Sequence, residues 1–511
     1  MFRILEWVNK AVWGLPALAL ILGVGIYLSV RSGFAQLSLF PRAIKLFFSR
    51  LRGNPGMDGT VSPFRALCTA LAATVGTGNI AGVAGAIAIG GPGAIFWMWI
   101  CAVFGMVTKF AEATLAVRYR FKNSSGDLVG GPMYMIQNAM QKRWHWMAYT
   151  YSFFGVVAAF GVGNATQINA VISGVNEVIS FFGGIPEKKA DLLIGIVLAV
   201  LVTMMLLGGA KRIGAMAECL VPFASVAYLL LGLGVLIVCR RQIPHALSRI
   251  VRGACAPGAV TGGLVGSAMT ALRTGVSRGV FTNEAGMGTA SIAHASACVC
   301  HPVEQGMMGI VEVFLDTVVI CTMTALVILC SGVRIPYGND PGAALTTQAF
   351  AAVYGGWVSA FLAGALCCFA FATVLGWGLY GIRCAEFLFG PGSARFFAIL
   401  QAVVVVLGAV LETGTVWLLS ETVNGLMAIP NLIALAVLSP ELFRLTKEYR
   451  FKFGRFAADG GTYENINQCK PVRTVSYAEV PPPGCRGKEK GKDHLSLKHR
   501  SAGSGNSPGL L

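Results

Sequence analysis

Charged residues are scarce in this sequence. They make up only 12% of the 511 residues, whereas 55% of the residues are hydrophobic and the mean hydropathy is positive. A soluble globular protein carries roughly a quarter of its residues as charged side chains. The composition therefore excludes a large soluble enzyme and is typical of an integral membrane protein.

The sequence also lacks a disulfide framework and a metal-binding cysteine pattern. Most of the 14 cysteines stand singly in apolar stretches, as Cys101 and Cys219 do, and are expected to pack as small hydrophobic side chains. Cys298, Cys300 and His301 form a Cys-x-Cys-His group, but it has no second ligand pair at the spacing of a structural zinc site. We predict neither disulfides nor metal binding by this Cys-x-Cys-His group.

Positive charge is the one kind present in excess, with a formal net charge of +17. Part of it lies in the polar end of the chain, "KEKGKDHLSLKHRSAGSGNSPGLL", which has too little apolar surface to fold alone. No aromatic or folded module accompanies these charges, so no nucleic-acid partner is predicted. Residues 441–511 are expected to form a basic, largely disordered cytoplasmic tail at the anionic leaflet of the lipid bilayer.

Long apolar stretches fill the rest of the chain up to about Leu438. A hydrocarbon core about 30 Å thick needs about 20 apolar residues per helix. The first stretch is longer than a signal-peptide core and is followed by no clear cleavage site, so it is read as a membrane helix. The sequence predicts an all-α integral membrane protein with about eleven transmembrane helices, near residues 11–30, 66–89, 93–117, 147–179, 191–208, 215–239, 263–290, 306–331, 348–380, 396–411 and 416–438.

Basic residues in alternate loops predict the orientation, because such loops face the cytoplasm. The arrangement favours an outside N-terminus and a cytoplasmic C-terminus. One basic group opposes this scheme, which places it outside: Arg240, Arg241, Arg249 and Arg252. The supporting residues are Arg31, Arg42, Lys45, Arg50, Arg52 and Arg65 in the first loop, Arg118, Arg120, Lys122, Lys142 and Arg143 in the third, and Lys211 and Arg212 in the fifth.

Two predicted spans are interrupted by glycines and polar residues: "LAATVGTGNIAGVAG" (71–85) and "TALRTGVSRGVFTNEAGMGTASIAHA" (270–295). Without the first helix, they begin two successive groups of five helices, a pattern of inverted-repeat transporters whose site lies at the membrane midplane. Close helix packing is the alternative reason for the glycines. Asn79, Asn283 and Glu284 favour a site, because polar groups are expensive in hydrocarbon.

The glycine spacing from Gly76 to Ala81 also resembles a dinucleotide-binding turn, but that turn needs a preceding strand and an acidic residue about 20 positions later. Neither is present. An unwound membrane helix instead frees N–H groups for a carboxylate and C=O groups for a cation. A hard cation such as sodium is expected to take oxygen ligands only.

Several longer motifs resemble those of one transporter family. They are "GGPGAIFWMW" (90–99), "TKFAEATLAVRYR" (108–120), "GGPMYMI" (130–136), "FTNEAGMGTASIAHA" (281–295), "HPVEQGMMGIVEVFLDT" (301–317) and "FAFATVLGWGLYG" (369–381). Together they closely resemble the alanine or glycine:cation symporter family, also called sodium:alanine symporters. The resemblance extends in order from about Thr69 to Leu438.

That resemblance implies the leucine-transporter-type fold, with two inverted five-helix repeats and one additional N-terminal helix. We expect an N-terminal helix and basic cytoplasmic loop in residues 1–64, the first repeat in 65–262 and the second in 263–440. The resemblance implies no enzyme activity and no cofactor. It implies sodium-coupled uptake of a small neutral amino acid such as alanine or glycine, by alternating access, in a bacterial cytoplasmic membrane.

The resemblance also implies a substrate site and an ion site. In the substrate site, backbone amides would bind the carboxylate and two aromatic rings would limit side-chain size. The implied substrate residues are Thr77, Gly78, Asn79, Gln167, Phe281, Thr282, Asn283 and Trp377, and the implied sodium ligands are the carbonyls of Ala72 and Val75 and the hydroxyl of Thr373. Relatives commonly carry Ser or Thr where this sequence has Ala372, which leaves sodium or proton coupling open.

Other functions compete with this interpretation. A proton-coupled carrier and a membrane-embedded amino-acid sensor remain alternatives. "GVSRG" (275–279) matches the nucleophile elbow of hydrolases around Ser277, but that motif requires a strand-to-helix turn.

Three pairs of charged residues also lie in the apolar part. Lys109 and Glu112 are predicted to pair as a clamp. Arg278 and Glu284 are candidates for a gate or scaffold pair. Glu312 and Asp316 are expected to form structural hydrogen bonds, with proton binding as the alternative.

Overall fold

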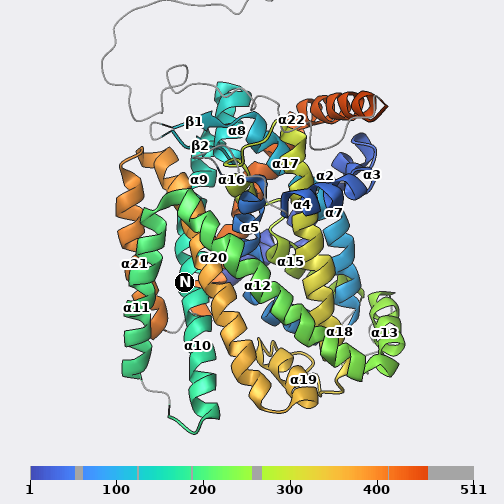
Figure 1. Cartoon of the computed structure of the whole chain (residues 1–511), viewed down its shortest axis with the longest axis vertical. Helices are drawn as coiled ribbons and strands as arrows, with labels where there is room; N and C mark the ends of the chain where they lie inside the picture. Colours follow the sequence, from blue (N-terminus) through green and yellow to red (C-terminus); the bar gives the residue numbers. More distant parts are fainter. Residues whose placement is uncertain are drawn as a thin grey trace, which may run out of the picture.

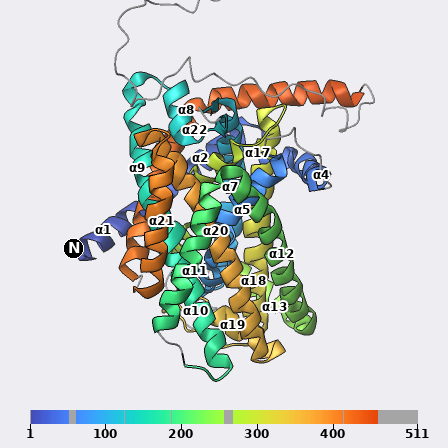
Figure 2. The same ribbon diagram turned by 60° about the vertical axis from the view of Figure 1, so that its left-hand side comes forward.

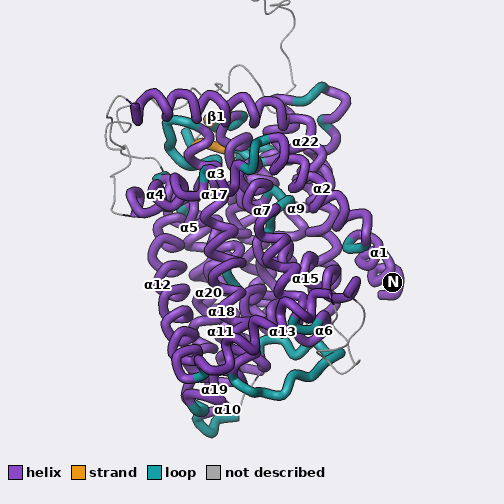
Figure 3. The backbone as a smooth tube through the Cα atoms, turned by 90° about the vertical axis from the view of Figure 1, so that its right-hand side faces the viewer, coloured by secondary structure: helices purple, strands orange, loops and turns teal. Residues whose placement is uncertain are grey.

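The computed structural model describes residues 2–51, 61–123, 126–185, 188–255, 268–411 and 414–458. Helices form nearly all of this part (Figures 1 and 3). Its named strands are one small antiparallel pair, β1 (Phe121–Lys122) with β2 (Leu128–Val129), and loops make up the rest. The prediction of an all-α architecture is thereby confirmed.

The first group of five spans begins with a broken helix. It comprises α5 (Pro63–Thr74) with the π-helical η1 (Gly78–Gly82) and α6 (Val83–Gly90), then α7 (Gly93–Arg118), α9 (Trp146–Phe160) continued by η3 (Gly161–Ala165) and α10 (Thr166–Phe181), α11 (Lys188–Leu207) and α12 (Gly209–Val238).

The second group repeats this order and also begins with a broken helix. It comprises α15 (Ala268–Asn283) with α16 (Thr289–His294), α17 (Pro302–Val313) continued by η5 (Phe314–Cys321) and α18 (Thr322–Cys330), α20 (Trp357–Phe389), α21 (Ser393–Val410) and α22 (Gly414–Ala458). Residues 263–267 of the predicted second broken helix lie outside the described residues.

The remaining helices are peripheral or connecting. They are α1 (Phe2–Val12), α2 (Leu15–Arg31), α3 (Ala35–Ser38), α4 (Phe40–Leu51), α8 (Pro132–Ala139), η2 (Lys142–Trp144), η4 (Arg240–Gln242), α13 (Ile243–Cys255) and α19 (Ala344–Tyr354). Helix α2 is the additional N-terminal helix, and it packs against α7 and α22.

The two groups pack together along their lengths. Helix α7 packs against α15 and α17, α10 against α20, and α11 against α21. Both breaks are therefore enclosed by other helices. The last part of α22 passes Pro440 and lies across one end of the bundle, while α13 and α19 lie at the opposite end (Figure 2). Residues 441–458 of the predicted tail are thus helical, and the rest of that tail lies outside the described residues.

Eight helices in the described ranges are long and apolar enough to cross a membrane, and the bent pair of α5 with η1 and α6 makes nine. Two further predicted spans do not meet this test. Helix α2 contributes only a shorter apolar stretch, Pro16–Arg31, and the second broken helix carries many polar residues. The count of eleven therefore stays a prediction.

One predicted span was expected to be a single helix but consists of two helices. The stretch 348–380 is not a single helix, because α19 ends at Tyr354 and α20 starts at Trp357. Gly355 separates them with a φ of 80°, a positive angle that glycine adopts most easily because it has no Cβ. The long helix that carries Thr373 and Trp377 is α20 alone.

Candidate functional site

The first break is closed by a side chain of its own segment. Helix α5 ends at Thr74, Val75 is extended, and the next half-helix is bent by 53°. Oδ1 of Asn79 accepts a hydrogen bond of 2.9 Å from the backbone N–H of Gly76. A Cβ at Gly76 would lie 3.0 Å from Oγ1 of Thr373, so a glycine here allows α20 to approach closely.

The other end of the Asn79 amide reaches the second half of the molecule. Its Nδ2 donates to Oδ1 of Asp316 at 2.7 Å, and Thr317 donates to Oδ2 of the same carboxylate at 2.8 Å. Asn283 in turn donates to Thr317 at 3.1 Å. All four side chains are buried. This chain of hydrogen bonds joins the two broken helices through η5, and it occupies both ends of the Asn79 amide with protein groups.

The second break lies at residues 284–288, between α15 and α16. Glu284, Gly286 and Gly288 have positive φ angles of 53°, 95° and 77°. Oε1 of Glu112 accepts from the N–H groups of Gly286 and Gly288 at 2.9 and 3.1 Å, and from Nδ2 of Asn431 at 2.8 Å. A carboxylate at helix N-terminal amides is electrostatically favourable. Glu112 thus satisfies amides that the break leaves without helical partners.

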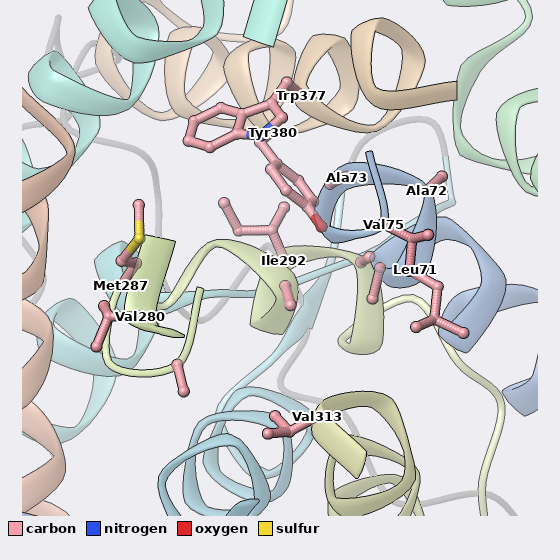
Figure 4. Close-up of a cluster of buried hydrophobic side chains, with 14 of the residues drawn as sticks. Leu71, Ala72, Ala73, Val75, Val280, Met287, Ile292, Val313, Trp377 and Tyr380 are labelled. Atoms are coloured by element: carbon pink, nitrogen blue, oxygen red, sulfur yellow. The ribbon is translucent and has the colours of Figure 1, made fainter. Parts of the chain in front are cut away.

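Trp377 is connected to the same break. Its indole N–H donates to Oε1 of Glu284 at 3.0 Å, and Thr289 donates to Oε2 at 2.5 Å. Gly163 makes room for the indole, since a Cβ there would lie 2.3 Å from Cβ of Trp377. Figure 4 shows Trp377 with Tyr380 on α20, near Ala73 and Ile292 of the two broken helices.

Gln167 and Thr77 lie together, as expected for residues of one site. Oγ1 of Thr77 is 3.4 Å from both Oε1 and Nε2 of the Gln167 amide. The amide also donates to the carbonyl of Val162 at 3.1 Å. Val162 belongs to η3, and the wider turns of a π-helix leave carbonyls available to side chains.

Thr282 and Gly78 bring the two breaks close together. A Cβ at Gly78 would lie 3.5 Å from both Cα and Oγ1 of Thr282. The Thr282 hydroxyl itself donates to the carbonyl of Arg278 at 2.7 Å. Phe281 is only partly buried in the last turn of α15 and packs at the edge of the hydrophobic core.

Two of the predicted ion ligands lie within hydrogen-bond distance of each other. Oγ1 of Thr373 donates to the carbonyls of Ala72 and Phe369, each at 3.0 Å. Val75 is buried beside them in the break, and Ala372 is buried on α20. The structure therefore brings Ala72 and Thr373 together. Val75 directly follows the last residue of α5 and has an extended backbone.

The charged pairs differ from those predicted. Lys109 forms its salt bridge with Glu312 at 3.2 Å rather than with Glu112, because α17 packs directly on α7. Nε2 of His294 lies 2.7 Å from the same Glu312 carboxylate.

Arg278 is likewise paired elsewhere than expected. It pairs with Asp340 at 3.1 Å and Glu421 at 3.6 Å instead of Glu284. Ser277 lies within the continuous helix α15, not on a strand-to-helix turn. Across the residues that the structure describes, no group of three His, Cys, Asp or Glu residues could hold a metal ion.

Sequence reasoning missed two features of the site. One is the capping role of Glu112, and the other is the set of π-helical segments η1, η3 and η5. An ionisable residue inside an apolar span is by itself a functional candidate, so Glu112 did carry a signal. Its partners, the amides of Gly286 and Gly288, lie 174 and 176 positions away, and no feature of the sequence linked them to Glu112.

Comparison with known proteins places these observations in a family. The family model described as the sodium:alanine symporter family matches residues 1–456. Among curated proteins, the chain is 44% identical to "Sodium/alanine symporter AgcS" of Methanococcus maripaludis over 86% of this chain and 96% of that protein. It is also 36% identical to "Probable sodium/glutamine symporter GlnT" of Bacillus subtilis over 92% of this chain and 97% of that protein.

The fold is shared with a solved transporter structure. The structure of MhsT in complex with L-phenylalanine matches 75% of this chain and 90% of that chain, with a TM-score of 0.52 and 14% identity. This likeness confirms the leucine-transporter-type fold. The family model and the identity to curated transporters also confirm that the protein is a transporter and not an enzyme. The chain belongs to the sodium:alanine symporter family.

Proposed function

We propose that this transporter imports a small neutral amino acid, such as alanine or glycine, together with sodium by alternating access. The observation that supports this most directly is the meeting of the two breaks, where Gly78 faces Thr282 and the hydroxyl of Thr373 reaches the carbonyl of Ala72. Such breaks offer backbone amides to a carboxylate and carbonyls to a cation.

The proposed substrate site comprises Thr77, Gly78, Asn79, Gln167, Phe281, Thr282, Asn283 and Trp377. Within it, the amides near Thr77 and Gly78 would bind the carboxylate of the substrate. Asn79 and Asn283 would act indirectly, by fixing the breaks through Asp316 and Thr317. The buried Trp377 would limit the size of the substrate side chain.

The proposed ion ligands are the carbonyls of Ala72 and Val75 and the hydroxyl of Thr373. All are neutral oxygens, and oxygen is the ligand atom that hard cations take. Ala372 supplies no hydroxyl, so the ion would depend more strongly on Thr373.

We place the protein in the cytoplasmic membrane of a bacterium, with its C-terminus in the cytoplasm. The end of the bundle that carries α4 and the last part of α22 is rich in basic residues, which supports a cytoplasmic location. The basic tail that follows would lie at the anionic leaflet of the lipid bilayer.

The decisive experiment is uptake of labelled alanine into proteoliposomes that contain the purified protein. An inward sodium gradient should drive accumulation, and an inside-negative potential should increase it, because co-transport of a zwitterion with sodium moves net charge worth about 2.3 kcal/mol per 100 mV. The absence of gradient-stimulated uptake of any amino acid in a panel of glycine, alanine and glutamine would refute the proposal.

Two alternatives give different results in the same assay. A proton-coupled carrier would continue to transport when choline replaces sodium at fixed pH. A membrane-embedded sensor would bind alanine saturably without accumulating it, and deletion of the tail would leave that binding intact.

A further inference from the structure

A large cavity opens at the end of the bundle opposite the last part of α22. It has a volume of about 900 Å³ and lies between the end of α12, the start of α13 and the end of α18. Figure 2 shows these three helices together at that end. The residues that line the cavity belong to neither break, and the proposed transport site does not use it.

The cavity is lined by basic groups from the loop that opposes the predicted orientation. Among the residues that the structure describes, Arg240, Arg241, His245 and Arg249 line it and no carboxylate does. Within the described ranges none of the three arginines forms a salt bridge. Arg249 donates a hydrogen bond to the hydroxyl of Tyr337 at 3.1 Å, which leaves its charge uncompensated.

Helix ends do not neutralise this charge. Helices α12 and α18 both end at the cavity, and a helix C-terminus carries about half a negative unit charge. Two such ends offset about one of the three arginine charges. The cavity therefore remains strongly positive, which favours an anion.

Apolar side chains border the same cavity. Ile237 and Val238, in the last turn of α12, are 57% and 69% exposed. Helix α13 is amphipathic, with Ile250 fully buried and Val251 55% exposed. A soluble anion would gain nothing from these apolar neighbours, whereas a lipid with an anionic headgroup would use both surfaces.

We propose that this cavity binds the phosphate headgroup of an anionic phospholipid from the leaflet at this end of the bundle. Arg240, Arg241 and Arg249 would contact the phosphate, and the acyl chains would pack beside Ile237 and Val238. The proposal also gives a reason for arginines in a loop that the orientation rule places outside. In this proposal the arginines bind a lipid, and they have no part in setting the orientation of the chain in the membrane.

The test is native mass spectrometry of the full-length protein titrated with phosphatidylglycerol, phosphatidylcholine or inorganic phosphate. Wild-type protein should retain phosphatidylglycerol preferentially. The double variant R240Q/R241Q should bind the first phosphatidylglycerol about thirtyfold more weakly, as about 1 kcal/mol per basic residue implies. R249Q is a second, milder variant that should weaken binding several-fold if the double variant is unstable.

The matched control is K211Q/R212Q, an adjacent exposed basic pair at the opposite end of α12. It should leave the first binding step unchanged. Equal losses in both double variants, equal retention of phosphatidylcholine, or equal binding of inorganic phosphate would each overturn the proposal. Alanine uptake by R240Q/R241Q should persist, so failure of this proposal and failure of the transport proposal are distinguishable.

Discussion

Asn79 donates a hydrogen bond of 2.7 Å to Asp316 across 237 positions of sequence, and this bond ties the first broken helix to η5. Both residues are almost fully buried. The same asparagine closes the first break through Gly76, so its position governs both the local backbone and the contact with the second half. This relationship leads to the first of four predictions.

Asn79→Ala and Asp316→Ala should each reduce alanine uptake and thermal stability, because each leaves a buried polar partner unsatisfied. In a double-mutant cycle on unfolding, we expect a coupling energy between about 0.5 and 3 kcal/mol. The control is a second Asn–Asp pair, Asn176 with Asp191, joined at 3.0 Å between α10 and α11. Alanine substitutions in that pair should leave uptake nearly unchanged, and an equal effect on uptake in both pairs would contradict the role given to Asn79.

Thr373→Ala should weaken sodium binding about ten- to a hundredfold, because it removes a hydroxyl worth about 1.5–3 kcal/mol to a charged partner. The measurement is the sodium concentration that gives half-maximal alanine uptake. Thr446→Ala is the matched control. Both threonine residues are 3% exposed, and the hydroxyl of each donates to the carbonyl four positions earlier. Similar sodium dependence in the two variants would show that the ion binds elsewhere.

Gly163→Ala should abolish or strongly reduce uptake, because the added Cβ would lie 2.3 Å from Cβ of Trp377. Either η3 or α20 must shift, and the bond between Trp377 and Glu284 would be disturbed. The control is Gly364→Ala, on the same helix as Trp377. A Cβ at Gly364 meets no atom within 4 Å, so this variant should retain full uptake. Normal transport by Gly163→Ala would mean that the exact position of Trp377 is unimportant.

Lys109→Met should lower the free energy of unfolding by about 3–5 kcal/mol, because it removes the lysine charge from the buried carboxylate of Glu312 and leaves that carboxylate with its hydrogen bond to His294. Lys452→Met removes an exposed salt bridge to Glu448 and should change the free energy of unfolding by less than about 1 kcal/mol. Thermal unfolding in detergent provides the comparison. If the two variants were equally stable, the Lys109–Glu312 pair would have no structural importance.

Much of the fold was predictable from the sequence because membrane helices leave a strong local signal. Apolar runs located most of the spans, and polar residues among glycines located both breaks. The meeting of Thr77 with Gln167 and of Ala72 with Thr373 agrees with the residues that the family resemblance implied. Their roles in binding remain predictions.

Contacts between helices were less predictable. Lys109 and Glu112 are one turn apart and were expected to pair, yet each is directed to a different neighbour, Glu312 and the second break. Helical spacing shows which residues share a face but not which helix packs on that face. The π-helical segments were also missed, because a single added residue per turn leaves no clear pattern in an apolar run.

The two halves of this repeated fold differ in how their breaks are held. The first break is supported within its own segment, because Asn79 keeps the Gly76 amide paired, and the same side chain also ties this break to Asp316. The second break is stabilised by α7, because Glu112 of that helix accepts hydrogen bonds from two of its amides. Any movement that separates α16 from α7 would leave the buried amides of Gly286 and Gly288 without their hydrogen-bond acceptor. The transport cycle is therefore expected to be asymmetric: the first broken helix can tilt once the Asn79–Asp316 bond breaks, whereas the second must carry α7 along or lose its bonds to Glu112.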